Sequence, residues 1–411
     1  MTGYGPTVVA SELTIKATDG TEISINVHSA GGKALLLWLP SEHGPQTVAS
    51  QLIAELTKSG MEVWQIDPFE TNFLPVSFSS MEKIPAEQIS SLIQAAHKRT
   101  GKTIYIYSTG RGAIPVLRGA RHWQQQNPES TALAGVILLS PIMSVETPDP
   151  GLEEQFMPVV TATNLPVFIL QPDLSPWFWK LERSVSALQQ GGSDVYVRRL
   201  KDVRARFHFR PDATRFEQQF TNKIPELIIQ SVLQLAHLPN KPRAAVALAK
   251  PAPKPRVGKK ERSLKEYKGD SNPPALKLKN LKDKMVDLKS LHGQVVLVNF
   301  WATWCPPCVH EMPSMQRLTN KLKSKPFTIL AVNMAEEKST IQNFINTKVK
   351  VNFPIVMDKD GTALRNWKVF AFPTSYLIDK KGQIRFALFG SIEWDTPDII
   401  NKIEMLVKEP D

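Results

Sequence analysis

The chain contains two cysteines, Cys305 and Cys308, which lie three positions apart. Two thiols at this spacing suit thiol–disulfide exchange, in which one thiolate attacks a disulfide and the second thiol resolves the mixed disulfide. The preceding apolar run 295–301 predicts a buried strand, and the apolar spacing over 309–322 predicts a helix interrupted by Pro313. We therefore place Cys305 as an exposed nucleophile at a helix N-terminus, where amide dipoles favour the thiolate, and expect Cys308 to be more buried.

The residues beside the cysteines argue against other uses of this pair. Pro306 and Pro307 suit the first turn of a helix, because N–H groups there have no partner within the helix. Haem attachment requires a histidine after the second cysteine, where this chain has Val309. Zinc would have to bind His310 or His292 without a second cysteine pair, so we expect neither a metal nor a cofactor. An inert pair of core cysteines stays open as an alternative.

The sequence around the cysteines resembles the TlpA/ResA-like branch of the thioredoxin superfamily. The resemblance rests on residues 298–308 (VNFWATWCPPC), on residues 311–313 (EMP), and on residues 372–374 (FPT) before a strand that ends at Asp379. It covers residues 274–411 and implies a thioredoxin-like fold. It also implies a periplasmic or membrane-tethered thiol–disulfide oxidoreductase, often a reductant in cytochrome c maturation or metal-site assembly.

The same resemblance implies roles for residues other than the cysteines. Pro373 is expected to be cis and to face the cysteine pair. The groove for a substrate strand is expected to include Trp304, Pro306, Pro307, Phe372 and Thr374. Ordinary thioredoxins place a buried Asp six residues before the first cysteine, and this chain has Asn299 there. The TlpA/ResA-like branch has a Glu in the active-site helix instead, so Glu311 is expected to tune the cysteine pKa values and relay protons. The alternative is a solvated glutamate on the helix surface.

Strands and helices alternate around this motif. The apolar runs predict strands at 276–278, 286–288, 327–334, 352–357, 374–378 and 384–389, and helices at 339–346 and 397–408. This order predicts an α/β sheet with a mixed-direction edge.

Composition places the chain among ordinary soluble globular proteins, with 411 residues, 42% of them hydrophobic and 22% charged. No stretch approaches the roughly 18 apolar residues that a transmembrane helix needs. Of the net charge of +11, +7 falls between Lys241 and Asp270, where ten basic residues stand against three acidic ones. Because this region is also rich in proline, we predict an extended linker over 239–273. We expect no nucleic-acid partner, although a polyanion-binding adaptor acting through the linker is an alternative.

Residues 1–238 predict a second α/β domain. The predicted strands are 12–17, 22–28, 34–39, 61–66, 103–107, 134–139, 166–171 and 194–200, with helices at 86–99 and from 113 through 118. Such a βαβ succession favours a doubly wound, mostly parallel sheet. The order, with a tight strand–turn–helix at its centre, resembles the α/β-hydrolase fold.

This hydrolase-like region lacks the nucleophile that the fold would use. The nucleophile elbow reads Gly-x-Ser-x-Gly, and the aligned segment 108–112 (STGRG) has Gly110 at the nucleophile position. Asp173 and His208 lie roughly where the acid and base would fall, and the loop 41–46 lies where the oxyanion-hole segment would be. We therefore predict a non-catalytic module that binds a ligand or partner. The alternative is a serine-type hydrolase with an unusual elbow, regulated by the redox domain.

The expected partners are proteins with client disulfides or dithiols and a membrane thiol carrier that donates electrons. We expect a reductase in the periplasm, because having no cysteines beyond the active pair avoids mispairing in an oxidising compartment. The first residues, MTGYGPTVV, lack the basic and apolar regions of a secretory signal. A cytoplasmic location is therefore the alternative, unless an anchoring segment is missing from this sequence.

Overall fold

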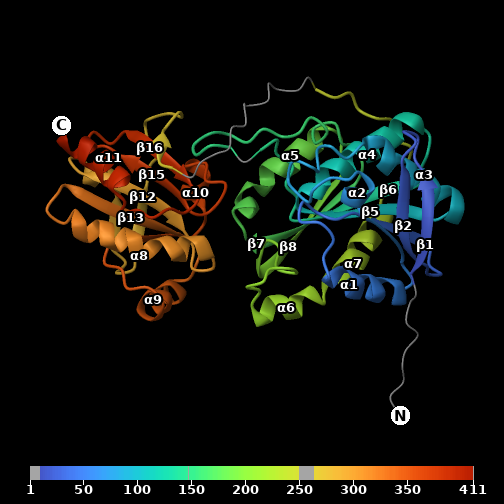
Figure 1. The fold of residues 1–411 in the computed structure, drawn as a ribbon, viewed down its shortest axis with the longest axis horizontal. Coiled ribbons are helices and arrows are strands. Elements are labelled where there is room, and N and C mark those ends of the chain that lie inside the picture. Colours follow the sequence, from blue (N-terminus) through green and yellow to red (C-terminus); the bar gives the residue numbers. More distant parts are fainter. Residues whose placement is uncertain (1–9, 147, 250–262, 411) are drawn as a thin grey trace, which may run out of the picture. The chain divides into compact units, whose positions relative to one another are not determined.

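The computed structural model describes residues 10–146, 148–249 and 263–410, which form two compact units (Figure 1). Unit 1 comprises Met1–Val145 and Phe156–Lys254, and unit 2 comprises Glu146–Gln155 and Pro255–Asp411. Across the described ranges, no helix is long and apolar enough to cross a membrane.

Unit 1 is built on an eight-stranded sheet in the order β1-β2-β4-β3-β5-β6-β7-β8. The strands are β1 (Ser11–Lys16), β2 (Glu22–His28), β3 (Ala34–Trp38), β4 (Glu62–Ile66), β5 (Thr103–Thr109), β6 (Leu133–Leu139), β7 (Val167–Leu174) and β8 (Val195–Arg204). Strand β2 is antiparallel to both of its neighbours, whereas the strands from β4 to β8 in this order run parallel. The predicted doubly wound, mostly parallel sheet is therefore present.

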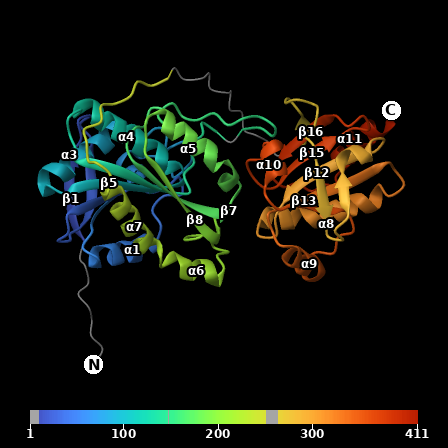
Figure 2. The ribbon, with the colours of Figure 1, turned by 180° about the vertical axis from the view of Figure 1, so that it is seen from behind.

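Two hydrophobic cores lie on the two faces of this sheet, because successive strand residues point to opposite faces. Leu35 and Leu37 of β3 pack in the core that contains α3 (Ala86–Thr100) and α4 (Ala113–Gln126). Leu36 and Trp38 pack in the core that contains α1 (Val48–Lys58) and α7 (Ile224–Ala236). Figure 2 shows the two pairs of helices on either side of the strands. The remaining helices are α2 (Pro68–Thr71), α5 (Leu181–Gln190) and α6 (Arg215–Thr221).

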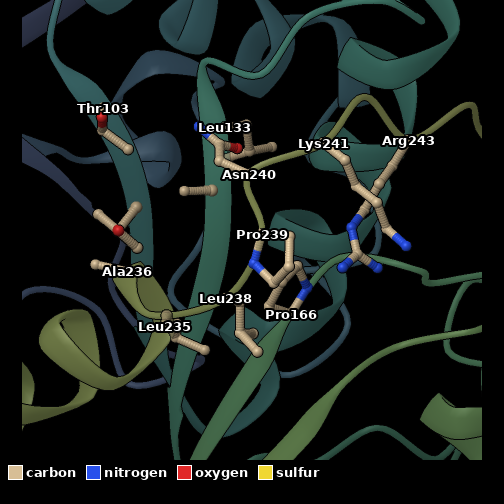
Figure 3. Close-up of a pocket in the computed structure, with 12 residues that line it drawn as sticks. Thr103, Leu133, Pro166, Leu235, Ala236, Leu238, Pro239, Asn240, Lys241 and Arg243 are labelled. Carbon is tan, nitrogen blue, oxygen red and sulfur yellow. The ribbon is translucent and has the colours of Figure 1, made fainter.

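Both ends of the predicted linker 239–273 are attached to folded units. In unit 1, Asn240 donates to the carbonyl of Thr131, and the carbonyl of Arg243 accepts from Gln124. Figure 3 shows Pro239, Asn240 and Lys241 beside the starts of β5 and β6, where they line a cavity of about 120 Å³. In unit 2, Lys265–Glu266 forms the edge strand β9. Residues at both ends of the predicted linker thus contact folded units, and its middle, residues 250–262, lies outside the described residues.

Unit 2 has an eight-stranded mixed sheet in the order β11-β10-β14-β13-β12-β15-β16-β9. The strands not yet defined are β10 (Lys277–Asn280), β11 (Met285–Asp287), β12 (Val295–Trp301), β13 (Phe327–Met334), β14 (Ile355–Asp358), β15 (Thr374–Ile378) and β16 (Ile384–Phe389). Strands β12, β13 and β14 are parallel, and β15 is antiparallel to β12. Every residue of β12 is buried, as its uninterrupted apolar character predicts.

The helices of unit 2 are α8 (Pro306–Lys321), α9 (Lys338–Thr347), α10 (Thr362–Asn366) and α11 (Pro397–Lys408). The predicted interruption of α8 at Pro313 is wrong, because the helix runs through that residue. Proline removes one N–H and so costs one hydrogen bond to the carbonyl four residues back, here that of Val309. The rest of the sixteen-residue helix continues around this loss.

Candidate active site

The cysteines lie where the central strand of unit 2 passes into α8. Cys305 is the N-cap residue of α8, and its sulfur accepts a hydrogen bond of 3.3 Å from the backbone N–H of Cys308. The two residues form a disulfide with their Cα atoms 5.3 Å apart. Cys308 is fully buried and Cys305 is 5% exposed, so their order of burial is as expected. In this disulfide form, however, Cys305 is largely covered rather than exposed.

The residues between and before the cysteines differ in exposure. Pro306 and Pro307 occupy the first two positions of α8 and are exposed to solvent. Trp304 is half-buried. Its ring contacts that of Phe372, with ring centroids 5.6 Å apart. The cysteine loop therefore meets the loop before β15 through an aromatic contact.

Strand pairing explains why these two loops meet. Phe300, near the end of β12, is paired with Thr374, the first residue of the antiparallel strand β15. The chain that leaves β12 toward Cys305 and the chain that enters β15 from Pro373 therefore lie at the same end of the sheet. The Phe372–Pro373 peptide is cis, and Pro373 is buried. The Thr374 hydroxyl donates 2.7 Å to the carbonyl of Ala371.

Glu311 lies one helical turn beyond Cys308 and is fully buried, so the alternative of a solvated surface glutamate is wrong. Its Oε1 accepts 2.8 Å from the Asn299 amide, and its Oε2 accepts 3.0 Å from the Trp394 indole N–H. Burial raises the pKa of Glu311 to about 8, although these two hydrogen bonds and a third from the backbone of Ile392 act in the opposite direction. A carboxyl group with such a pKa can exchange a proton near neutral pH.

Asn299 on β12 holds this carboxyl group from the sheet side. Its Nδ2 also lies 2.9 Å from the Ser375 hydroxyl, and its Oδ1 has no hydrogen-bond partner in the described structure. The side-chain amide of asparagine does not ionise near neutral pH. Asn299 therefore positions the proton acceptor Glu311 and does not accept the proton itself.

A second acid, the half-buried Glu336, fixes the loop that leads into Cys305, and no sequence pattern predicted it. Its carboxylate accepts from the backbone N–H of Thr303 at 2.7 Å, from the Thr303 hydroxyl, and from the Asn333 amide at 2.7 Å. Burial raises the pKa of Glu336, with these hydrogen bonds opposing it. Trp394 and Ser375 were missed as well. No local pattern marks these side chains, because their partners are far away in sequence.

In unit 1, the segment aligned with a nucleophile elbow joins β5 to α4. Gly110 lies there with φ +55°, a left-handed conformation that favours glycine. The Glu42 carboxylate accepts 2.7 Å from the backbone N–H of Arg111. A Cβ atom at position 110 would lie only 2.5 Å from Glu42 Oε2. The space beside Gly110 is thus filled by a carboxylate of the chain itself.

Asp173 and His208 do not form an acid–base pair in the described structure. The Asp173 carboxylate accepts from Arg199 Nε and from the Asp202 backbone N–H, each at 2.9 Å. His208 Nδ1 is buried without a hydrogen-bond partner. Burial, with a smaller contribution from the nearby His43, lowers the pKa of His208 to about 4. The neutral imidazole therefore lacks the carboxylate that would orient a catalytic base.

Comparisons with known proteins concern unit 2. Residues 270–387 match the AhpC/TSA family. The thiol-disulfide oxidoreductase ResA of Bacillus subtilis (strain 168) is 35% identical over 138 residues, which are 34% of this chain and 75% of that protein. ResA of Bacillus thuringiensis subsp. konkukian (strain 97-27) is 38% identical over 111 residues, 27% of this chain and 64% of that protein. The chain therefore spans just under two thirds of this second relative.

The solved structures include the thioredoxin domain of a thiol-disulfide oxidoreductase from Bacteroides vulgatus. It is 27% identical, with a TM-score of 0.31, and the alignment covers 34% of this chain and all of that domain. The family match and the curated relatives confirm the thioredoxin-like fold predicted for the C-terminal part.

Proposed function

Through its C-terminal part the chain belongs to the ResA family of thiol-disulfide oxidoreductases, and on this premise we propose that it reduces protein disulfides with Cys305 and Cys308. One observation carries the proposal: the cysteine pair caps the N-terminus of α8, and the buried carboxyl group of Glu311 follows one turn later. A nucleophile activated by a helix N-terminus and a proton acceptor near neutral pH are what the exchange requires.

The reaction begins when the Cys305 thiolate attacks one sulfur of a client disulfide. The client S–S bond breaks, a mixed disulfide forms, and the second client sulfur leaves as a thiolate that takes up a proton from solvent. The Cys308 thiol then loses its proton and attacks the Cys305 sulfur, which releases the other client thiolate. Two electrons pass to the client, and the Cys305–Cys308 disulfide remains. An external dithiol must reduce that disulfide before the next turnover.

Glu311 is the acceptor we propose for the Cys308 proton. It lies on the same helix face as Cys308, three residues further on, and it is buried with that thiol. Asn299 and Trp394 hold its two oxygens, so the carboxyl group is fixed in one orientation. When the enzyme disulfide is reduced again, the same group returns a proton to Cys308.

Client recognition is assigned to the surface around the disulfide. Exposed Pro306 and Pro307, and the Trp304–Phe372 contact, form the rim beside which a client strand would lie. The backbone around Pro373 and Thr374 would pair with that strand, as in other members of the thioredoxin superfamily. The clients we propose are disulfides of cytochrome c or metal-site precursors, which the TlpA/ResA-like resemblance implies.

We also propose an extracytoplasmic location and a membrane thiol carrier as electron donor. The two cysteines both belong to the reactive pair, so an oxidising compartment offers no other thiol of this chain for mispairing. A donor dithiol at a membrane would restore the reduced form after each turnover.

For unit 1 we propose an α/β-hydrolase-like module without hydrolase chemistry that binds a ligand or a client. Its support is the strand–turn–helix at Gly110 within a doubly wound sheet. Serine-type catalysis is opposed by the glycine at the nucleophile position and by Glu42 beside it. The polyanion-binding alternative depends on the basic linker, much of which lies outside the described residues.

Insulin reduction in the presence of dithiothreitol tests the proposed activity. The full chain should accelerate precipitation of the insulin chains, Cys305→Ser should lose this activity, and His310→Ala on the exposed side of α8 should keep it. If Cys305→Ser were as active as the wild type, the proposed function would be wrong. Equilibration with glutathione gives the direction, since a potential below roughly −250 mV indicates a reductant and one near −120 mV an oxidant. We expect the reductant.

A further inference from the structure

The loop between β16 and α11 places a tryptophan inside unit 2. Trp394 is completely buried, and its indole N–H donates 3.0 Å to Oε2 of Glu311. Its backbone N–H donates 3.0 Å to the Ser314 hydroxyl, which donates in turn 2.7 Å to the carbonyl of Glu311. The loop is therefore joined to α8 at the turn that carries the buried acid.

Ion pairs on the exposed side of α8 hold the same loop. Arg317 binds Asp395 through two hydrogen bonds of 3.0 Å and binds Glu393 at 2.7 Å. Lys321 binds the Asp395 carboxylate at 3.1 Å. Arg317 holds the pKa of Asp395 at about 2, with Lys321 contributing. Glu393 and Asp395, the residues on both sides of Trp394, are thus bound to α8. These contacts hold the indole in position beside Glu311.

We propose that Trp394 is a positioning residue of the redox site: its indole N–H fixes the Glu311 carboxyl group and favours the charged form of that group. A hydrogen bond from a neutral donor to a carboxylate stabilises the charge, more so where water is excluded. Burial alone favours the neutral acid. Together with Asn299 and the backbone of Ile392, Trp394 therefore limits how far burial raises the pKa of Glu311, and this keeps the carboxyl group able to ionise near neutral pH.

The other groups that face Glu311 do not replace this donor. Asn299 on β12 donates to Oε1 of Glu311 and also to the Ser375 hydroxyl on β15. The backbone of Ile392 also forms a hydrogen bond with the Glu311 carboxyl group. The cysteines on α8 are joined in a disulfide in this form. The charged residues of the loop, Glu393 and Asp395, are paired with Arg317 and Lys321. Oε2 thus receives its side-chain hydrogen bond from Trp394.

This inference rests on the proposed function, because it concerns the pH range in which Glu311 accepts the proton of Cys308. Without the indole N–H, Glu311 would stay protonated to higher pH. At neutral pH a smaller fraction of the enzyme would then hold the carboxylate. Resolution of the mixed disulfide would be slower, and would recover its rate when the pH is raised.

Carbon-13 NMR of glutamate carboxyl groups in the oxidised full chain tests the inference directly. The Glu311 signal is identified by its loss in Glu311→Gln, and is expected to titrate near pH 8. Trp394→Phe should move this titration upward by about one pH unit or more, the effect of losing one hydrogen bond to a charged group. Trp367→Phe is the matched control, because Trp367 is buried in the same unit and its indole N–H has no partner in the described structure.

Two results would overturn the inference. One is a pKa of Glu311 in Trp394→Phe that equals the wild-type value. The other is an upward shift of this pKa in Trp367→Phe as large as that in Trp394→Phe, which would indicate that loss of any buried indole in unit 2 disturbs the packing around Glu311. If Trp394→Phe does not fold, Ser314→Ala decides, because it keeps the indole but frees its backbone anchor. An upward shift supports the inference, and no shift contradicts it. The titration does not depend on thiol chemistry. If the wild type did not reduce insulin, the proposed function would therefore be wrong, but the role of Trp394 in the ionisation of Glu311 could still be measured.

Discussion

The Asn299 amide on β12 donates a hydrogen bond of 2.8 Å to the carboxyl group of Glu311 on α8. Ordinary thioredoxins have an aspartate at the position of Asn299, so in this chain the buried acid has moved from the strand to the helix. The amide holds the new acid in place instead of titrating itself. The relationship makes the ionisation of Glu311 one property from which pH effects on unit 2 should follow, beside the raised pKa of Glu336.

Glu311 should make the stability of unit 2 depend on pH. Its pKa is raised by burial to about 8 in the folded protein, whereas the reference value is 4.5. The folded state therefore binds one proton more than the unfolded state between these values, and stability falls as the pH rises through them. The contribution is complete below about pH 4.5 and lost above about pH 8. Its size should be of the order of a few kcal/mol.

Glu311→Gln removes this dependence, because glutamine does not titrate. We expect the variant to gain stability relative to the wild type as the pH is raised from 5 to 9. Urea unfolding of the oxidised protein, monitored through hydrogen exchange of β12 peptides, measures the free energy of unfolding of unit 2 alone. The wild type and Glu311→Gln are compared in this way. Parallel stability curves of the two proteins over this pH range would show that Glu311 is not the titrating group.

Glu336 should stabilise the loop before Cys305. Replacing it with alanine leaves the Thr303 N–H and the Asn333 amide without their carboxylate acceptor, at a cost of about 1 kcal/mol for each part-buried donor. Glu336→Gln retains one carbonyl oxygen and should lose about half as much. Urea unfolding of unit 2 compares the two variants. A stability of Glu336→Ala equal to that of the wild type would contradict this account of the loop.

Gly110 should be sensitive to any side chain. In Gly110→Ala the added Cβ would lie 2.5 Å from Glu42 Oε2, and the alanine would have to adopt φ +55°. The left-handed backbone should cost about 1–2 kcal/mol. The Cβ should also displace Glu42 from the Arg111 N–H. Gly101→Ala is the matched control, because φ is +63° there and open space surrounds the added carbon. Thermal unfolding of unit 1 should show that Gly110→Ala is less stable than Gly101→Ala. The difference in the free energy of unfolding should equal the loss of one hydrogen bond to a charged group, about 1.5–3 kcal/mol.

The extra cost should disappear in a Glu42→Ala background, where no carboxylate opposes the new Cβ. If Gly110→Ala and Gly101→Ala were equally destabilising in the wild type, Glu42 would not fill the space at the elbow. The same set tests the hydrolase alternative. Ester hydrolysis that falls in Ser108→Ala would show that a serine acts despite Gly110.

Sequence patterns predicted secondary structure correctly where the local sequence alone determines a strand or helix. The strands Phe327–Met334 and Ile384–Phe389 have the bounds that their apolar runs predict, and so does the helix Pro397–Lys408. The capping position of Cys305 followed from a strand, a short loop and two prolines in succession. The helix α7 is not among the predicted elements, although its apolar residues follow the helical period that predicts such a helix.

Contacts between distant segments could not be predicted in this way. Trp394 lies among polar residues in a loop, and only the folded chain shows that its indole meets Glu311, 83 residues away. Glu42 and Arg111 are 69 residues apart, and a carboxylate in a loop carries no sign that it will fill a vacant elbow. Proline and lysine predict extended chain, and extended chain can also lie along a folded surface, as it does at Asn240 and Arg243.

Trapping of the mixed disulfide tests the central claim most directly. Reduced full-length protein is mixed with a disulfide-containing peptide, and adducts are measured by mass spectrometry without reductant. The account predicts that Cys308→Ser accumulates one peptide adduct on Cys305, because the resolving thiol is absent, and that Cys305→Ser accumulates little, because Cys308 is fully buried. Equal adducts on the two variants, or an adduct on Cys308 alone, would contradict the assignment of Cys305 as the nucleophile.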